Sequence, residues 1–175
     1  MAAEQLIGSW KEVRAGLIEE AAQIPEDQFS FRPTPDTRSV AELLQHILEA
    51  QKMLVGETCR EETNLMRQSF ADHIKEYASD VRPVTDKNGL LEMLRSSMEV
   101  AEACIRSHGD NLGASMTRFD GKEMSKLDFL QFATAHEMYH RGQFTVYERL
   151  LNIKPALTTR FEKILSAQSA AGASD

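Results

Sequence analysis

The 175-residue chain is long enough for one domain with a single hydrophobic core, because 42% of its residues are hydrophobic. Its formal net charge of −7 and its scattered basic residues disfavour nucleic acid and membrane surfaces as partners, so we expect a small-molecule substrate or a protein partner. Cys59 and Cys104 form no CxxC pair, and neither a signal-like segment nor a membrane-length apolar run is visible. We therefore expect a cytoplasmic protein with reduced, buried cysteines.

Apolar residues recur every three or four positions in four stretches of the chain, which predicts four amphipathic helices. Pro25 ends the first helix, and a proline-rich connector leads to the second, where Asp36, Thr37 or Ser39 can provide the N-cap. Ser125 is the expected N-cap of the last helix. The predicted helices cover residues 4–23, 40–56, 90–109 and 125–152.

The connection between the second and third helices, residues 57–88, is too long for a simple loop. Apolar residues between positions 66 and 77 predict a short helix inside it. No stretch with the alternating pattern of a β-strand competes with the helices, so we predict an all-α, antiparallel four-helix bundle with a long crossover. We expect the domain to cover residues 1–160, followed by a partly disordered extension, residues 161–175.

Three histidines on the predicted helices indicate a metal site. His136 and His140 are four residues apart, which places both imidazoles on one face of the last helix. A bundle builds a metal site from facing helices, and His46 lies at the edge of the apolar arc of the second helix. Three neutral imidazoles leave an open position on zinc and also suit nickel. We therefore predict that His46, His136 and His140 bind one divalent cation.

Two segments resemble the DinB-like (damage-inducible) family, whose members are regarded as metalloenzymes. They are "FRPTPDTRSVAELLQHILEAQ", which contains His46, and "HEMYHRGQFTVYERLLNIKP", which contains His136 and His140. The resemblance implies an antiparallel bundle, often a homodimer, with the three histidines on zinc or nickel. It also implies transfer or isomerisation reactions that use a low-molecular-weight thiol such as bacillithiol, mycothiol or glutathione. Residues 57–88 look longer than the minimal connection in that family.

Further side chains are candidates for the same site. Gln143 and Tyr147 share the face of His136 and His140 and are candidate substrate contacts or supports of the ligands; the alternative is that they are polar ends of a packed stripe. Glu49 could approach the ion or orient His46, although an exposed helix glutamate is the simpler interpretation. Gly142, inside the last helix, points to close approach by another helix or subunit, or to simple tolerance.

Residues 136–140 also match HExxH, the signature of zinc peptidases, in which the glutamate is the general base. We disfavour a peptidase because no substrate-holding strand is visible and because Glu137 can form an exposed ion pair with Arg141, four residues on. The favoured hypothesis is a metal-dependent thiol S-transferase or hydrolase. The alternative is a bundle that the metal braces without catalysis.

Overall fold

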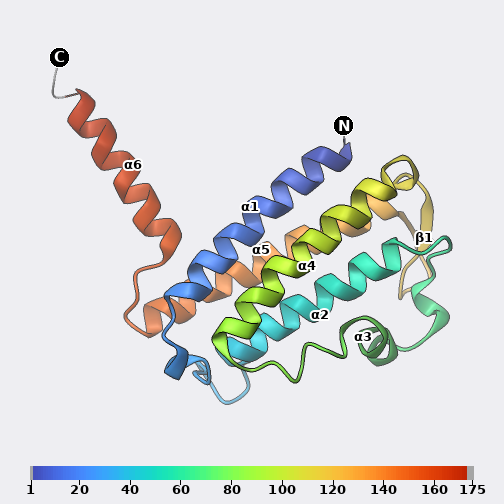
Figure 1. Cartoon of the computed structure of the whole chain (residues 1–175), viewed down its shortest axis with the longest axis horizontal. Coiled ribbons are helices and arrows are strands. Elements are labelled where there is room, and N and C mark those ends of the chain that lie inside the picture. Colours follow the sequence, from blue (N-terminus) through green and yellow to red (C-terminus); the bar gives the residue numbers. More distant parts are fainter. Residues whose placement is uncertain (1, 173–175) are drawn as a thin grey trace.

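The body of the protein is a bundle of four long helices (Figure 1). The computed structural model describes residues 2–172, and the side chains of residues 2–169. The predicted four-helix bundle is confirmed, with helix ends within a few residues of those expected from the sequence. The four helices are α1 (Ala2–Gln23), α2 (Val40–Thr58), α4 (Lys87–Ser107) and α5 (Lys126–Leu150).

The direction of the helices explains the long crossover. In Figure 1, α1 and α5 run one way and α2 and α4 run the other way. The chain must therefore travel back along the bundle after α2 before α4 can begin. On this return it forms a short 3₁₀ helix, η2 (Leu65–Arg67), and the helix α3 (Phe70–Ala78), which packs on α2. The predicted crossover with a short helix is confirmed.

Local sequence signals set the ends of the helices. Ser39 is the N-cap of α2: its side chain accepts a hydrogen bond from the backbone N–H of Glu42, and the Glu42 carboxylate accepts one from the backbone N–H of Ser39. This reciprocal pair satisfies two backbone donors that a helix start leaves free. Ser125 caps α5 in the same manner, by accepting from the N–H of Asp128 at 3.0 Å. At the far end of α5, Asn152 adopts φ 59°, a left-handed conformation that stops a helix.

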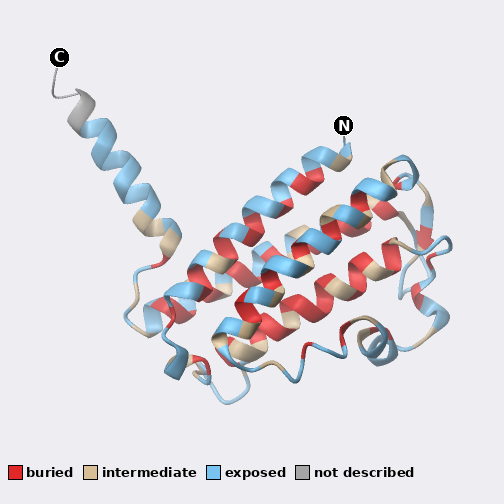
Figure 2. Cartoon of the chain, in the orientation of Figure 1, coloured by how far each residue is buried: buried red, intermediate tan, exposed pale blue. Residues whose placement is uncertain are grey.

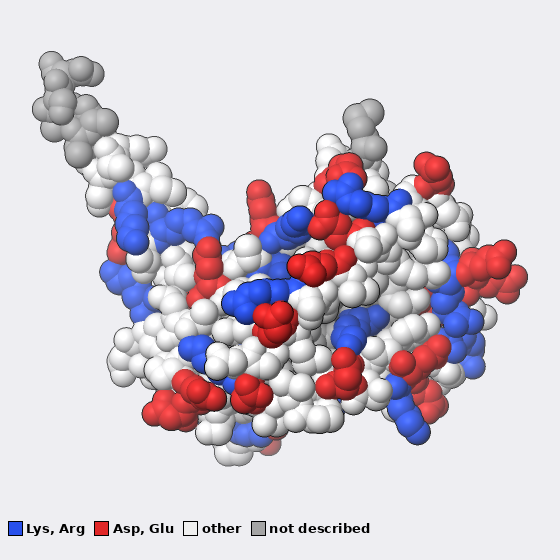
Figure 3. Space-filling model, in the orientation of Figure 1, with Lys and Arg blue, Asp and Glu red and all other residues white. Residues whose placement is uncertain are grey.

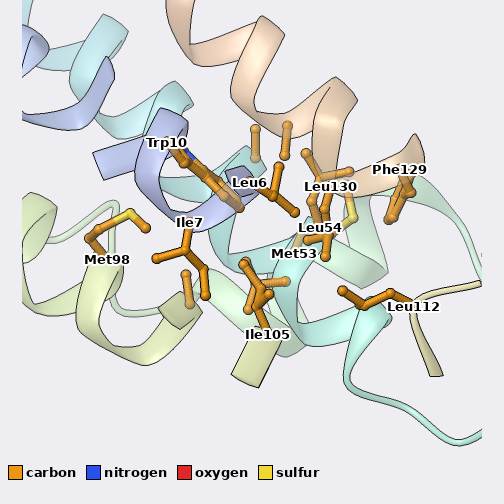
Figure 4. Close-up of a cluster of buried hydrophobic side chains, with 14 of the residues drawn as sticks. Leu6, Ile7, Trp10, Met53, Leu54, Met98, Ile105, Leu112, Phe129 and Leu130 are labelled. Carbon is orange, nitrogen blue, oxygen red and sulfur yellow. The ribbon is translucent and has the colours of Figure 1, made fainter. Parts of the chain in front are cut away.

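The inward faces of the four helices form the hydrophobic core, as the predicted amphipathic pattern requires (Figure 2). Trp10, Leu94 and Phe144 are completely buried. Figure 4 shows how Trp10 of α1 and Leu130 of α5 lie in one cluster with side chains of α2 and α4. This core fixes the relative position of α2 and α5, the two helices that carry the histidines.

A small β-hairpin, which the sequence analysis did not predict, joins α4 to α5. Strand β1 (Ser115–Thr117) pairs antiparallel with β2 (Glu123–Ser125), with Met116 opposite Met124. Gly121 adopts φ 74° in the turn, a conformation that glycine reaches at little cost. The Asp120-Gly121 pair is a common hairpin signal, but strands of three residues are too short to show an alternating pattern.

The C-terminal segment projects from the bundle as helix α6 (Ala156–Gly172) (Figure 1). Residues 161–172 of the extension that was expected to be partly disordered belong to this helix, because small residues such as alanine are compatible with a helix. Residues 173–175 lie outside the described part of the chain, and the domain boundary at residue 160 stays a prediction. Four large apolar side chains of α6 are exposed: Leu157, Phe161, Ile164 and Leu165.

The two cysteines do not remain separate. Cys59 at the end of α2 and Cys104 in α4 form a disulfide, with their Cα atoms 6.2 Å apart. The expectation of reduced cysteines is wrong, because the parallel course of α2 and α4 brings the two positions together. Disulfides are typical of oxidising compartments, so the cytoplasmic location stays a prediction.

Figure 3 shows acidic and basic side chains interspersed on one face of the molecule. None of the helices within residues 2–172 combines the length and the hydrophobicity that crossing a bilayer requires.

Candidate metal centre

The three predicted ligands meet between α2 and α5. The Nε2 atom of His46 lies 3.1 Å from that of His140 and 3.2 Å from that of His136, and the last two are 3.0 Å apart. The i,i+4 spacing places two imidazoles on the same face of α5, and the antiparallel packing of α2 brings the third to them. The structure therefore assembles His46, His136 and His140 as the sequence predicts.

This arrangement fits a divalent cation. Two nitrogens that are each about 2.0–2.1 Å from a tetrahedral ion lie about 3.3 Å apart, close to the observed separations. Three nitrogen atoms that face one another at this distance cannot all carry a proton, and three lone pairs repel one another unless a cation lies among them. The donor set thus matches zinc or nickel, both of which bind neutral imidazole.

All three imidazoles are predisposed to stay neutral. Burial, with the positive charge of Arg38 as the next cause, lowers the pKa of His46 to about 3. Burial, followed by the charge of His140, lowers the pKa of His136 to about 4. Burial also lowers the pKa of His140, while a hydrogen bond with Gln143 opposes the shift. Neutral rings have a free nitrogen lone pair, which metal binding requires.

Gln143 orients one histidine of the triad, His140. The Nδ1–H of His140 donates to the side-chain Oε1 of Gln143 at 2.8 Å, which leaves the lone pair of His140 on Nε2. Tyr147 is buried, and its hydroxyl donates to the backbone carbonyl of Arg38 at 2.9 Å. Tyr147 therefore holds the connector before α2 in place. Both residues lie on the α5 face that the sequence analysis identified.

Glu49 is neither a ligand nor an exposed residue. It is buried, and its carboxylate forms a bidentate ion pair with Arg82, with one contact at 2.8 Å. Both interpretations considered for Glu49 are wrong, because the crossover returns over α2 and places Arg82 against it. The pair ties the crossover to the helix that carries His46.

The expected exposed pair between Glu137 and Arg141 is also wrong. Glu137 is buried against α1, where its carboxylate accepts from Arg14 at 2.5 and 2.8 Å and from the indole N–H of Trp10 at 2.8 Å. A rotation of about 100° separates neighbouring helix positions, so Glu137 points away from the face of His136. Both carboxylate oxygens are occupied, which leaves no general base for a peptidase reaction at this position.

Arg141 forms an ion pair with a different residue, Glu20 of α1, at 3.5 Å. Its guanidinium lies against the backbone of Gly16, where any Cβ atom would collide with it. The next residue, Gly142, is exposed, and within the described chain no atom approaches the position of its missing Cβ. The close approach considered for Gly142 therefore does not occur inside this chain.

Two cavities flank the triad. One, of about 410 Å³, is lined by His46, His136 and mostly apolar side chains from α2, α5, the crossover and the hairpin. The other, of about 530 Å³, is lined by polar residues of the connector before α2, including Arg32 and Arg38, and by Gln143 and Tyr147. The sequence analysis missed the connector arginines and the hairpin wall; the Asp120-Gly121 turn was the one available signal for the hairpin.

The remaining histidines have local partners. His73 is completely buried, and its two ring nitrogens contact Glu57 at 2.9 Å and the carbonyl of Leu65 at 3.0 Å. His108 is the C-cap of α4, and its Nδ1 lies 3.0 Å from the carbonyl of Cys104. Neither lies in the triad.

Comparison with known proteins agrees with this fold. A sequence model of the DinB superfamily matches residues 9–144, which include all three histidines. The chain belongs to the DinB superfamily. It is 23% identical over 146 residues to the uncharacterized protein YjoA of Bacillus subtilis (strain 168), covering 83% of this chain and 88% of YjoA.

Solved structures share the fold of this DinB-family chain. The crystal structure of YjoA superposes with a TM-score of 0.66 at 22% identity and covers 85% of this chain and 92% of its own. YfiT of Bacillus subtilis, described as a probable metal-dependent hydrolase with an unusual four-helix bundle topology, has a TM-score of 0.66 at 17% identity, covering 87% and 89%. The mycothiol-dependent maleylpyruvate isomerase has a TM-score of 0.60 at 12% identity, and the match covers 79% of this chain and 59% of that one.

Proposed function

We propose that this DinB-family chain binds one zinc or nickel ion through His46, His136 and His140 and uses it in thiol transfer to, or hydrolysis of, a small molecule. The convergence of the three Nε2 atoms at 3.0–3.2 Å is the observation that supports the proposal. Three imidazoles leave coordination open, as in catalytic zinc sites. A cation held there would lower the pKa of a bound thiol or water and supply a nucleophile at neutral pH.

The surrounding residues fit a reaction of two small molecules. The polar cavity offers the guanidinium of Arg38, which suits the carboxylate of a low-molecular-weight thiol, whereas the guanidinium of Arg32 pairs with Glu42. The cavity on the other side of the triad is largely apolar. The likeness to a mycothiol-dependent isomerase and to a probable metal-dependent hydrolase supports both branches of the proposal.

Metal content tests the first step. Untagged protein should contain about one equivalent of metal by elemental analysis, and His46→Ala should contain almost none. His108→Ala is the matched control, because His108 lies outside the triad and should leave the metal content unchanged. Equal metal content in wild type and His46→Ala would refute the site.

The response to small ligands distinguishes a catalytic metal site with an open coordination position from a metal ion that only stabilises the bundle. In the cobalt-substituted protein, azide or a small thiol should change the visible spectrum if a coordination position is open. Turnover of glutathione with an aryl halide would then indicate transfer, and cleavage of a chromogenic ester would indicate hydrolysis. A cobalt spectrum that azide and thiol leave unchanged would favour the non-catalytic brace.

We also propose that the protein is a homodimer, as its family resemblance implies. The exposed residues Leu157, Phe161, Ile164 and Leu165 recur at helical spacing on α6, and such a stripe favours burial against another chain. Light scattering should give twice the monomer mass of 19.7 kDa for the wild type and a lower mass for Phe161→Glu. A monomeric wild type would refute the dimer.

A further inference from the structure

We propose that the apolar cavity beside the triad binds an uncharged, ring-bearing part of the small-molecule substrate and so selects the substrate class. The inference rests on the proposed function, because the reacting group of that substrate would have to reach a cation held by the histidines. It goes further by assigning the Phe70, Phe119 and Phe132 side chains to substrate recognition.

The position of the cavity connects it to the metal centre. His46 and His136 form part of its wall, so a molecule inside it touches the rings of two ligands. Its volume of about 410 Å³ falls in the range of about 300–1,000 Å³ that is usual for small-molecule sites. A substrate of one or two rings therefore fits with its reactive end toward the triad.

Aromatic side chains dominate the walls. The rings of Phe70 and Phe119 pack edge to face with centroids 5.7 Å apart, and the ring of Phe132 lies 6.1 Å from that of His136. These three phenylalanines remain 54%, 43% and 55% exposed, respectively. Leaving large apolar groups in water is unfavourable, and a bound ring would cover them in the edge-to-face or offset arrangements that aromatic rings prefer.

The charges around the cavity indicate that the bound group is neutral. Among the described residues that line it, the ionised side chains are Arg118 and Asp120, which pair with each other at 3.3 Å. No free charge is left to recognise a carboxylate or an amine. In the polar cavity Arg32 pairs with Glu42, but Arg38 forms no ion pair with the described residues, so the two cavities suit different chemical groups.

Two of the three phenylalanines lie on segments outside the four helices of the bundle. Phe70 begins α3 in the crossover, and Phe119 lies at the tip of the β1–β2 hairpin. Only Phe132, of these three residues, lies on a helix of the four-helix body. The cavity therefore depends on features outside the four-helix core.

A coordinating probe tests the cavity directly. Imidazole and 4-phenylimidazole bind a metal through the same ring, but only the second carries a phenyl group. In the cobalt-substituted full chain, visible spectra should show 4-phenylimidazole binding at least about tenfold more tightly than imidazole. Phe119→Ala and Phe132→Ala should each remove most of that advantage.

Leu150→Ala is the control, because Leu150 is also 55% exposed but lies at the end of α5, outside the lining of the cavity. It should keep the full preference for 4-phenylimidazole. Equal affinities of the two probes for the wild type, or a preference that survives the Phe119→Ala/Phe132→Ala double substitution, would overturn the inference.

A measurement without metal distinguishes failure of the cavity from failure of the metal site. The uncharged dye N-phenyl-1-naphthylamine should fluoresce on binding to metal-free wild type, and the double variant should bind it about tenfold more weakly. If cobalt is not taken up but the dye behaves this way, the proposed function fails and the cavity assignment stands. If the double variant binds the dye like wild type, or if Leu150→Ala is the variant that loses it, the cavity assignment fails.

Discussion

His136 and Glu137 are neighbours on α5, yet they belong to two buried polar clusters of opposite character. Around Glu137, the carboxylate oxygens meet the guanidinium of Arg14 and the indole N–H of Trp10, so donors match acceptors. Around His136, three ring nitrogens of the same kind face one another. A cluster whose donors and acceptors are matched within the chain holds helices together, whereas one whose nitrogen lone pairs face one another is suited to bind a cation.

The largest expected effect is on metal affinity, which should depend on the histidine cluster and not on the cluster around Glu137. His46→Ala should weaken zinc binding by well over the roughly 100-fold typical of losing an outer contact, because it removes a ligand. Competition with a chromogenic chelator at pH 7.5 measures this. Glu137→Gln should keep the affinity of the wild type in its folded fraction; loss of zinc binding in that variant would contradict the division.

Stability should show the reverse pattern. Glu137→Ala leaves Arg14 buried without a counter-charge and should lower the free energy of unfolding of the metal-free protein by about 3–5 kcal/mol. Urea unfolding of the metal-free proteins provides the measurement. The double variant Arg14→Leu/Glu137→Leu should lose less than Glu137→Ala, because no unpaired charge remains. A loss below about 1 kcal/mol for Glu137→Ala would show that the pair is unimportant.

A smaller effect on zinc affinity is expected when the hydrogen bond between His140 and Gln143 is removed. Gln143→Ala removes the acceptor for the Nδ1–H of His140 and should weaken zinc binding by about 10–100-fold. Gln143→Glu retains an acceptor and should recover most of the affinity. Gln131→Ala changes an exposed glutamine of the same helix and should have no effect; the same loss in both alanine variants would argue against an orienting role.

The smallest effect is expected at a third buried cluster, formed by Glu20, Arg141 and Glu148. It contains two carboxyl groups but only one guanidinium. Burial, with the charge of Glu20 as the next cause, raises the pKa of Glu148 to about 8. The folded protein then binds a proton that the unfolded chain releases above about pH 4.5, so the contribution of Glu148 to stability falls as pH rises toward 8.

Glu148→Gln should therefore stabilise the protein relative to wild type at pH 9 more than at pH 5. Thermal or urea unfolding at the two pH values tests this. Glu162→Gln on α6 is the control, because Glu162 is exposed and pairs with Lys154. A pH-independent difference between wild type and Glu148→Gln would contradict the assignment.

Much of the bundle and the ligand set followed from the sequence. Helical periodicity, Ser39, Ser125 and the proline-rich connector are local signals, and each acts within a few residues of its position. The i,i+4 spacing of His136 and His140 is equally local. The third histidine could be paired with them because bundles bring polar residues at the edges of apolar faces together.

Contacts between distant segments could not be predicted in the same way. The partners of Glu49 and Glu137, namely Arg82 and Arg14, are separated from them by 33 and 123 residues. The rotation of a helix about its axis sets such pairings, and an error of one residue, about 100°, replaces one partner with another. The Cys59–Cys104 bridge and the aromatic cavity depend on the same relative placement.

By itself, the sequence determined the approximate ends of the four bundle helices, their apolar faces and the three side chains that offer a nitrogen lone pair, because these properties depend on neighbours along the chain. The tertiary structure alone decided that Glu137 and Glu49 hold helices together while the histidines converge. Only packing sets how each helix is turned and what the crossover and hairpin cover. Those contacts determine whether a buried polar group has a partner inside the protein.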